Sequence, residues 1–125
     1  MKVIKPDYHV DDTIQTIVGF DSALTGVINA EYSIRLEGDF EGEIRSQGSV
    51  FIGQKSKIRG SISALRVIVQ GEITGDVDVV ESIEIMRTGK LIGDIFGKKL
   101  IIDEGAVFKG NVNMDVISPS NIKEA

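Results

Sequence analysis

The feature that most constrains this chain is a short pattern, apolar-x-Gly-x-apolar, that recurs six times along the sequence. Its central glycines are Gly26, Gly42, Gly60, Gly75, Gly93 and Gly110. Successive glycines are 16, 18, 15, 18 and 17 residues apart. This period suits a solenoid of short strands and tight corners, and it is too short for a helical-hairpin repeat. Each copy therefore predicts one winding, and the chain is predicted to form about six.

A second apolar ladder runs in phase with the glycine pattern. Its members are Val18, Leu36, Ile52, Val69, Ile85 and Ile102, joined two residues earlier by Ile34, Val50, Val67, Ile83 and Leu100. Alternate residues of a strand point to the same side, so both sets are expected to face inward. If successive windings stack about 4.8 Å apart, these side chains form continuous columns and a dry core that no single winding could bury.

Together the two ladders predict an all-β chain, a right-handed parallel β-helix with short flexible tails. Left-handed β-helices usually repeat strict six-residue units, whereas the uneven period here favours the right-handed form. An antiparallel sandwich or barrel is the alternative, but it needs hairpin turns, and the chain contains no Asn-Gly or Asp-Gly pair. All the glycines lie between Pro6 and Pro119. We therefore predict a β-helix domain over residues 14–116, between tails at 1–13 and 117–125.

Composition argues against several classes of protein. The 14 Lys and Arg against 19 Asp and Glu give a net charge of −5, so no basic field is present to attract nucleic acid. The absence of cysteine excludes disulfides and thiolate metal sites. No apolar run has the length of a signal peptide or approaches the roughly 20 residues of a membrane span. We interpret the chain as cytoplasmic.

No arrangement of side chains in the sequence indicates catalysis. The single histidine, His9, lies in the predicted N-terminal tail, whereas the acyltransferases built on stacked β-windings use a histidine base held between windings. Glu43, Asp76 and Asp94 could line up in one column, but Ser61 interrupts it, and Ca²⁺ needs roughly six to eight converging oxygens. We predict no enzyme, no cofactor and no metal site.

The two ends of a solenoid carry unpaired strand edges, and a monomeric solenoid shields them with polar caps. Here both the first and the last winding are apolar. We predict that end-to-end polymerisation uses Val18, Phe20 and Leu24 at one end and Val107, Phe108 and Val112 at the other.

One outward-facing column is also unusually apolar. Between the inward pairs of the second ladder lie Arg35, Phe51, Ile68, Glu84 and Ile101. Three of these five are bulky and apolar where solvent would be expected, which favours a lateral contact between filaments through Phe51, Ile68 and Ile101. The alternative is cross-strand packing on a partly covered face.

Three segments together resemble the bactofilin family of bacterial cytoskeletal proteins. They are residues 52–60 (IGQKSKIRG), 69–77 (VQGEITGDV) and 105–110 (GAVFKG). The resemblance covers about residues 16–113. It implies a triangular right-handed β-helix that polymerises without nucleotide into non-polar filaments, with subunits meeting head to head and tail to tail. It also implies that Phe108 matches an apolar position of the last winding that polymerisation requires.

The resemblance carries further expectations for location and partners. Many bactofilins bind membrane through a short N-terminal segment of apolar and basic residues, and this chain offers Met1, Lys2, Val3, Ile4 and Lys5. Such a tail could bring the polymer to the inner face of the cell membrane; a plain flexible tail is the alternative. The implied roles are scaffolds for cell shape, for cell-envelope proteins or for segregation proteins.

The leading hypothesis is thus a structural protein of the bacterial cytoskeleton, a homopolymer that serves as a scaffold. A monomeric β-helix module that presents one face to a protein or a carbohydrate is the alternative.

Overall fold

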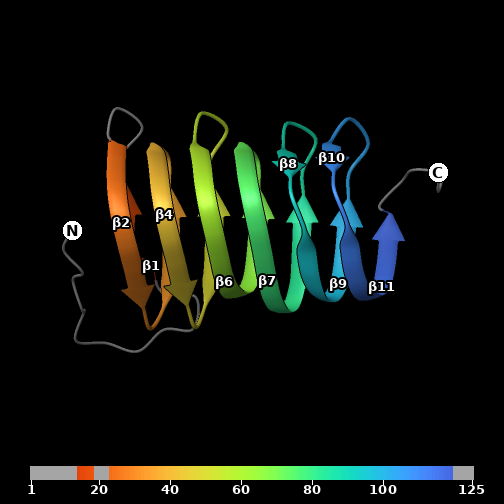
Figure 1. The fold of residues 1–125 in the computed structure, drawn as a ribbon, viewed down its shortest axis with the longest axis horizontal. Helices are drawn as coiled ribbons and strands as arrows, with labels where there is room; N and C mark the ends of the chain where they lie inside the picture. Colours follow the sequence, from red (N-terminus) through yellow and green to blue (C-terminus); the bar gives the residue numbers. More distant parts are fainter. Residues whose placement is uncertain (1–13, 19–22, 120–125) are drawn as a thin grey trace.

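The computed structural model describes residues 14–18 and 23–119, and all strand pairings in these ranges are parallel. The described part of the chain contains eleven strands and no helix. Figure 1 shows the windings side by side in a row, in sequence order from the N-terminal to the C-terminal end. The predicted parallel β-helix is confirmed, and the antiparallel alternative is wrong.

The strands vary from three to fourteen residues in length. They are β1 (Ile14–Val18), β2 (Ala23–Ala30), β3 (Ser33–Leu36), β4 (Asp39–Ser46), β5 (Ser49–Ile52), β6 (Lys57–Val69), β7 (Glu72–Ile85), β8 (Lys90–Ile92), β9 (Ile95–Ile102), β10 (Val107–Lys109) and β11 (Val112–Pro119).

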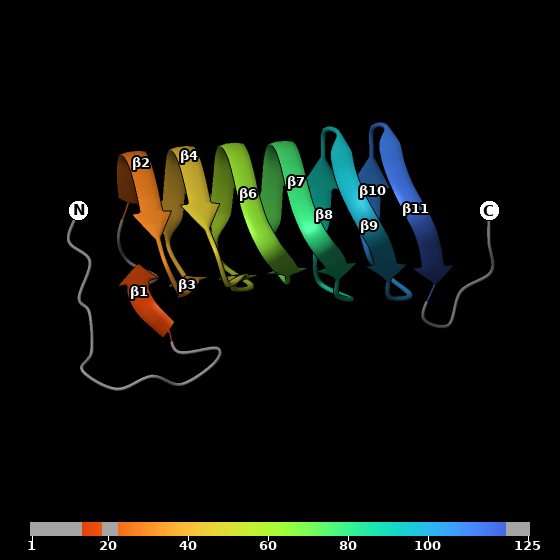
Figure 2. The ribbon, with the colours of Figure 1, turned by 90° about the horizontal axis from the view of Figure 1, so that it is seen from below.

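Two long strands, β6 and β7, tie the faces of the solenoid together. The first half of β6 pairs with β4 and its second half pairs with β5, so one strand passes from one face to the next. Strand β7 does the same with β8 and β9. In Figure 2 the row is seen from below, and β1 lies at the N-terminal end. It pairs with β3, which pairs with β5, and these strands together with the second halves of β6 and β7 form the second face.

The repeated glycines form a single column along the solenoid. Gly26, Gly42, Gly60 and Gly75 are directly in register. Each has a positive φ, +137° at Gly60 and +141° at Gly75, which side chains of L-residues rarely allow. A Cβ on Gly60 would overlap the carbonyl oxygen of Gly42. The six glycines therefore mark five complete turns, with part-turns beyond each end.

Both predicted apolar ladders are confirmed as the core. One inward column runs Leu24, Phe40, Ile58, Ile73, Leu91 and Phe108. Its four inner members are buried, whereas the two end members are only partly buried. In the second ladder every described side chain is buried except that of Ile102, which packs against the core. Burying one Ile or Leu in such a column contributes about 1.5–3 kcal/mol.

Buried serines complete the corners, where the strand ladder is interrupted. The Ser46 hydroxyl donates a hydrogen bond to the Tyr32 carbonyl at 2.7 Å. The backbone N–H of Ser49 donates to the Ser33 hydroxyl at 3.1 Å. These bonds join successive windings, so they satisfy polar groups that the corners would otherwise bury without a partner.

The predicted domain limits remain a prediction. The N-terminal tail and residues 120–125 lie outside the described residues, as does Phe20. Strand β11 continues to Pro119, three residues past the predicted end of the β-helix.

The glycine column generates a matched pair of variants. Gly60→Ala is expected to lower the free energy of unfolding by about 4 kcal/mol or more, because it adds a backbone clash to the strain of positive φ. Gly26→Ala is the control, because its φ is +139° but no atom lies within 4 Å of the added Cβ. It should cost only the strain, about 1–3 kcal/mol. Denaturant unfolding followed by circular dichroism would measure both, and equal losses would contradict the stacking account.

Candidate assembly surfaces

The N-terminal end of the solenoid is an open strand edge. Within the described ranges, β2 pairs only with β4, and β1 pairs only with β3. On β2, Leu24 is partly buried against the core and Val27 is 58% exposed. Val18 is in register with Leu36 at the end of β1. The structure thus brings Val18 and Leu24 to the same end, whereas the predicted contact residue Phe20 lies outside the described residues.

The C-terminal end is also an open strand edge. In the described part of the chain, β10 pairs only with β8 and β11 only with β9. Phe108 and Val112 are partly buried against the core, and Val107 is 40% exposed. The three residues predicted for this end therefore lie together on the last winding.

Backbone groups at this end point away from the molecule. The N–H of Val107 donates to the Gly89 carbonyl at 3.1 Å, and the Lys109 carbonyl accepts from the N–H of Gly93 at 2.8 Å. In a parallel ladder, alternate residues bond to opposite neighbours, so the N–H and C=O of Phe108 face the open end. This end therefore offers an apolar side chain and a free strand edge at the same residue.

Charge is arranged differently inside the solenoid and at its ends. One outward column runs Ala23, Asp39, Lys57, Glu72, Lys90 and Val107. The four charged members alternate in sign, so each winding is compensated by its neighbours. The column ends in an apolar residue at both ends. At each end of the solenoid no further winding could compensate a charge, and there this column carries an uncharged residue.

The predicted lateral residues lie in one column of the second face. The register places Arg35, Phe51, Ile68, Glu84 and Ile101 on successive windings. The three apolar members are partly buried, not fully exposed, so cross-strand packing already covers part of their surface. The two charged members separate them into a pair and a single residue.

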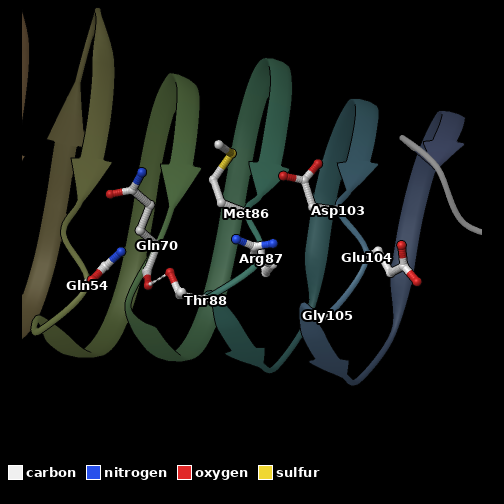
Figure 3. A pocket seen from close by; sticks show the side chains of 8 residues that line it. All are labelled: Gln54, Gln70, Met86, Arg87, Thr88, Asp103, Glu104 and Gly105. Atoms are coloured by element: carbon white, nitrogen blue, oxygen red, sulfur yellow. Dashed lines mark hydrogen bonds between the residues drawn. The ribbon is translucent and has the colours of Figure 1, made fainter.

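A hollow of about 610 Å³ lies along one corner of the solenoid, over successive turns (Figure 3). Its lining comes from the corner segments of neighbouring windings: Gln54, Gln70, Met86, Arg87, Thr88, Asp103, Glu104 and Gly105. The Thr88 hydroxyl donates to the Gln70 carbonyl at 2.8 Å and so joins two corners. This hollow was not predicted from the sequence. The sequence feature that could have indicated this hollow is the polar residue that directly follows the second apolar ladder, Gln70 in one winding and Asp103 in another.

The acidic column does not form a metal-binding cluster. Glu43 pairs with Arg45 at 2.7 Å, and one Asp94 oxygen accepts hydrogen bonds from the backbone and side chain of Asn111 at 3.3 and 3.2 Å. Ser61 separates Glu43 from Asp76, as the sequence indicates. Among the described residues, no group of three or more His, Cys, Asp or Glu side chains is placed to hold a metal ion.

Sequence reasoning missed two exposed apolar side chains, Val80 at 68% and Phe96 at 41% exposure. Between Asp78 and Ser82, strand β7 carries one more residue than its neighbours, which shifts the register. Such a bulge turns Val80 outward, whereas Phe96 lies at an ordinary outward position, in register with the exposed Asp78. The signal was the change of glycine spacing from 15 to 18 residues at this winding.

In the described part of the chain, the fold and its ends define an open-ended β-solenoid whose two terminal windings each present an apolar edge. Within residues 14–18 and 23–119, no helix is long and apolar enough to cross a membrane. Residues 16–113 match the family described as "Bactofilin: Polymer-forming cytoskeletal". The chain therefore belongs to the bactofilin family, as the resemblance indicated, and this family is polymer-forming and cytoskeletal.

Two relatives come from Myxococcus xanthus (strain DK1622). The chain is 26% identical to Bactofilin BacP over 121 residues, which cover 97% of the chain and 49% of BacP. It is 27% identical to Bactofilin BacO over 101 residues, which cover 81% of the chain and 80% of BacO. The chain thus spans about half the length of BacP. No solved structure matches the chain.

The two phenylalanines of one core column provide a test of the open end. Phe40 is 3% exposed inside the solenoid, whereas Phe108 is partly buried on the last winding. Phe40→Ala should lower the free energy of unfolding by about 3–5 kcal/mol. Phe108→Ala should cost less than about 2 kcal/mol, because fewer contacts are lost. Chemical unfolding at protein concentrations below assembly would measure both. Equal costs would show that Phe108 is a complete core residue with no surface left for a contact.

Proposed function

We propose that this chain is a structural subunit that assembles end to end, without nucleotide, into non-polar filaments. These filaments act as a scaffold for cell shape or for the localisation of other proteins. The observation that carries the proposal is that each end of the solenoid combines an open strand edge with a partly buried apolar side chain, Leu24 at one end and Phe108 at the other. The family's description as polymer-forming supports it.

The driving force in this proposal is contact between ends. When two ends meet, the exposed parts of Leu24 or Phe108 leave water, and the free edges gain hydrogen bonds. Neither contribution requires a nucleotide, a metal ion or a catalytic step. The proposal accordingly includes no enzymatic activity and no cofactor.

The chemistry of the ends permits contacts between like ends. A two-fold contact brings each residue near its own copy, so charges close to the axis would repel each other. The alternating charge column ends in Ala23 and Val107, which can face their own copies without repulsion. A subunit with two self-complementary ends builds a filament without polarity.

We extend the proposal to the N-terminal residues Met1, Lys2, Val3, Ile4 and Lys5, which lie outside the described residues. In a cytoplasmic filament these segments would be repeated on every subunit, so weak individual binding to an anionic inner membrane surface would add up. Removing residues 2–5 should abolish co-sedimentation of filaments with phosphatidylglycerol vesicles while leaving the filaments intact. Unchanged co-sedimentation would count against membrane binding through this segment.

Blocking one end at a time tests how the subunits meet. Phe108→Arg places an unpaired charge in an apolar contact, so it should abolish filaments in buffer without nucleotide or added metal. If like ends meet, this variant can still pair through its N-terminal end and should form dimers. Leu24→Arg should likewise form dimers, through the C-terminal end. Electron microscopy and analytical ultracentrifugation over a range of concentrations would measure the assemblies.

Controls separate assembly from folding in this experiment. Phe40→Arg lies in the same column but in an inner winding, so it should abolish the β-sheet signal in circular dichroism as well as the filaments. Val80→Arg replaces an exposed apolar residue on β7, an inner strand with neighbours on both sides, and should leave the filaments intact. If the wild-type protein remains a uniform small particle at all concentrations, the filament proposal fails and the monomeric binding module replaces it.

A further inference from the structure

We propose that the second face of the solenoid is a two-fold contact surface for a second copy of this chain, lying antiparallel beside the first. The surface is the outward column that runs, from the N-terminal end, Arg35, Phe51, Ile68, Glu84 and Ile101, and the strand register continues to Ile17 before it and to Ser118 after it. From Arg35 to Glu84 this column reads positive, apolar, apolar, negative. Reversing its direction exchanges only the two signs of charge.

An antiparallel copy of such a column is complementary to the original. If the two-fold axis passes between Phe51 and Ile68, then Phe51 lies opposite Ile68 of the second copy. The same axis places Arg35 opposite Glu84 of the second copy, and this happens twice. A parallel copy in register would instead place Arg35 opposite Arg35 and Glu84 opposite Glu84. The charges therefore favour the antiparallel arrangement and oppose the parallel one.

The local environment of the two charged residues supports this pairing. Within the described part of the chain, the partly buried carboxylate of Glu84 has no hydrogen bond and no ion pair. Arg35 donates through Nε to Glu37 at 2.6 Å. A guanidinium has five N–H groups, so the terminal nitrogens of Arg35 can also bind a carboxylate of a second copy.

The apolar residues at the proposed axis have surface left to bury. Phe51 and Ile68 are both partly buried on neighbouring windings. A hollow of about 130 Å³ lies beside them and gives space for a side chain from a second copy. The flat face of stacked parallel strands suits packing against an identical face.

The contact uses neither end of the solenoid, so it is compatible with end-to-end assembly. In a non-polar filament the subunits alternate in direction, so a neighbouring filament always offers antiparallel copies. The joining of two filaments rests on the proposed function, whereas the pairing of two subunits does not.

Cysteine cross-linking tests the register directly, because the chain contains no cysteine. Arg35→Cys and Glu84→Cys are prepared separately, mixed and treated with a short bismaleimide, because opposed sheets lie about 10 Å apart and a direct disulfide needs Cα atoms within about 7 Å. In a mixed pair, one opposed position holds the two cysteines, and the other retains Glu84 of the first variant opposite Arg35 of the second. The mixture should form bismaleimide-linked dimers at least about five times faster than either variant alone.

The single variants are the controls for this experiment. In the proposed arrangement the two copies of residue 35 are three windings apart, about 14 Å, because windings are spaced about 4.8 Å. Across sheets about 10 Å apart, this offset separates the two cysteines by about 17 Å, beyond the reach of a short bismaleimide. Cross-linking of Arg35→Cys with itself as fast as in the mixture, or no cross-linking in the mixture, would overturn the proposal.

Charge exchange distinguishes this contact from assembly at the ends. Glu84→Arg should abolish paired filaments in electron micrographs and leave single filaments, whereas the double variant Arg35→Glu, Glu84→Arg should restore the pairs. Asp76→Arg, an exposed carboxylate on another face, should leave the pairs unchanged. Paired filaments that persist in Glu84→Arg would contradict the lateral contact. Selective cross-linking without any filaments would support it and would contradict the end-to-end proposal instead.

Discussion

Parallel pairing between successive windings, closest at the glycine column, is the constraint on which the rest of this structure depends. Because Gly60 lies directly against the carbonyl of Gly42, the windings can approach only if no side chain stands between them. That close approach fixes the register, and the register stacks equivalent residues of successive windings over one another. The core columns, the alternating charges and the outward column of the second face all follow from this one alignment.

The same pairing that stabilises each inner winding leaves the two terminal windings incomplete. An inner strand such as β6 has a neighbour on both sides, whereas β2 and β10 each have one in the described part of the chain. Proteins that remain monomeric cover such edges or place charges on them. In this member of the bactofilin family the ends are apolar, and Leu24 and Phe108 are only partly buried. The proposed filament completes what the monomer lacks.

Much of the fold could be predicted from the sequence, because a repeated pattern indicates which residues of successive windings lie over one another. Six spaced glycines indicate both the number of turns and their alignment, so the spacing alone is enough to place Phe108 over Leu91. The extra residue of β7 was harder, because a bulge that exposes Val80 depends on how neighbouring windings accommodate it. The corner bonds of Ser46 and Ser49 were also missed, since they join residues that are distant in sequence and follow no apolar pattern. The partial burial of Phe51 depends on cross-strand packing, which the spacing does not reveal.

The central claim is that windings continue to stack along the filament, from one subunit to the next. Fibre diffraction from oriented filaments tests it most directly. Stacking along the filament axis predicts a strong reflection at about 4.8 Å on the meridian, parallel to that axis, because this is the spacing between paired strands. If the reflection at this spacing lies on the equator instead, the subunits associate side by side, and the account of the open ends as the assembly surfaces is contradicted.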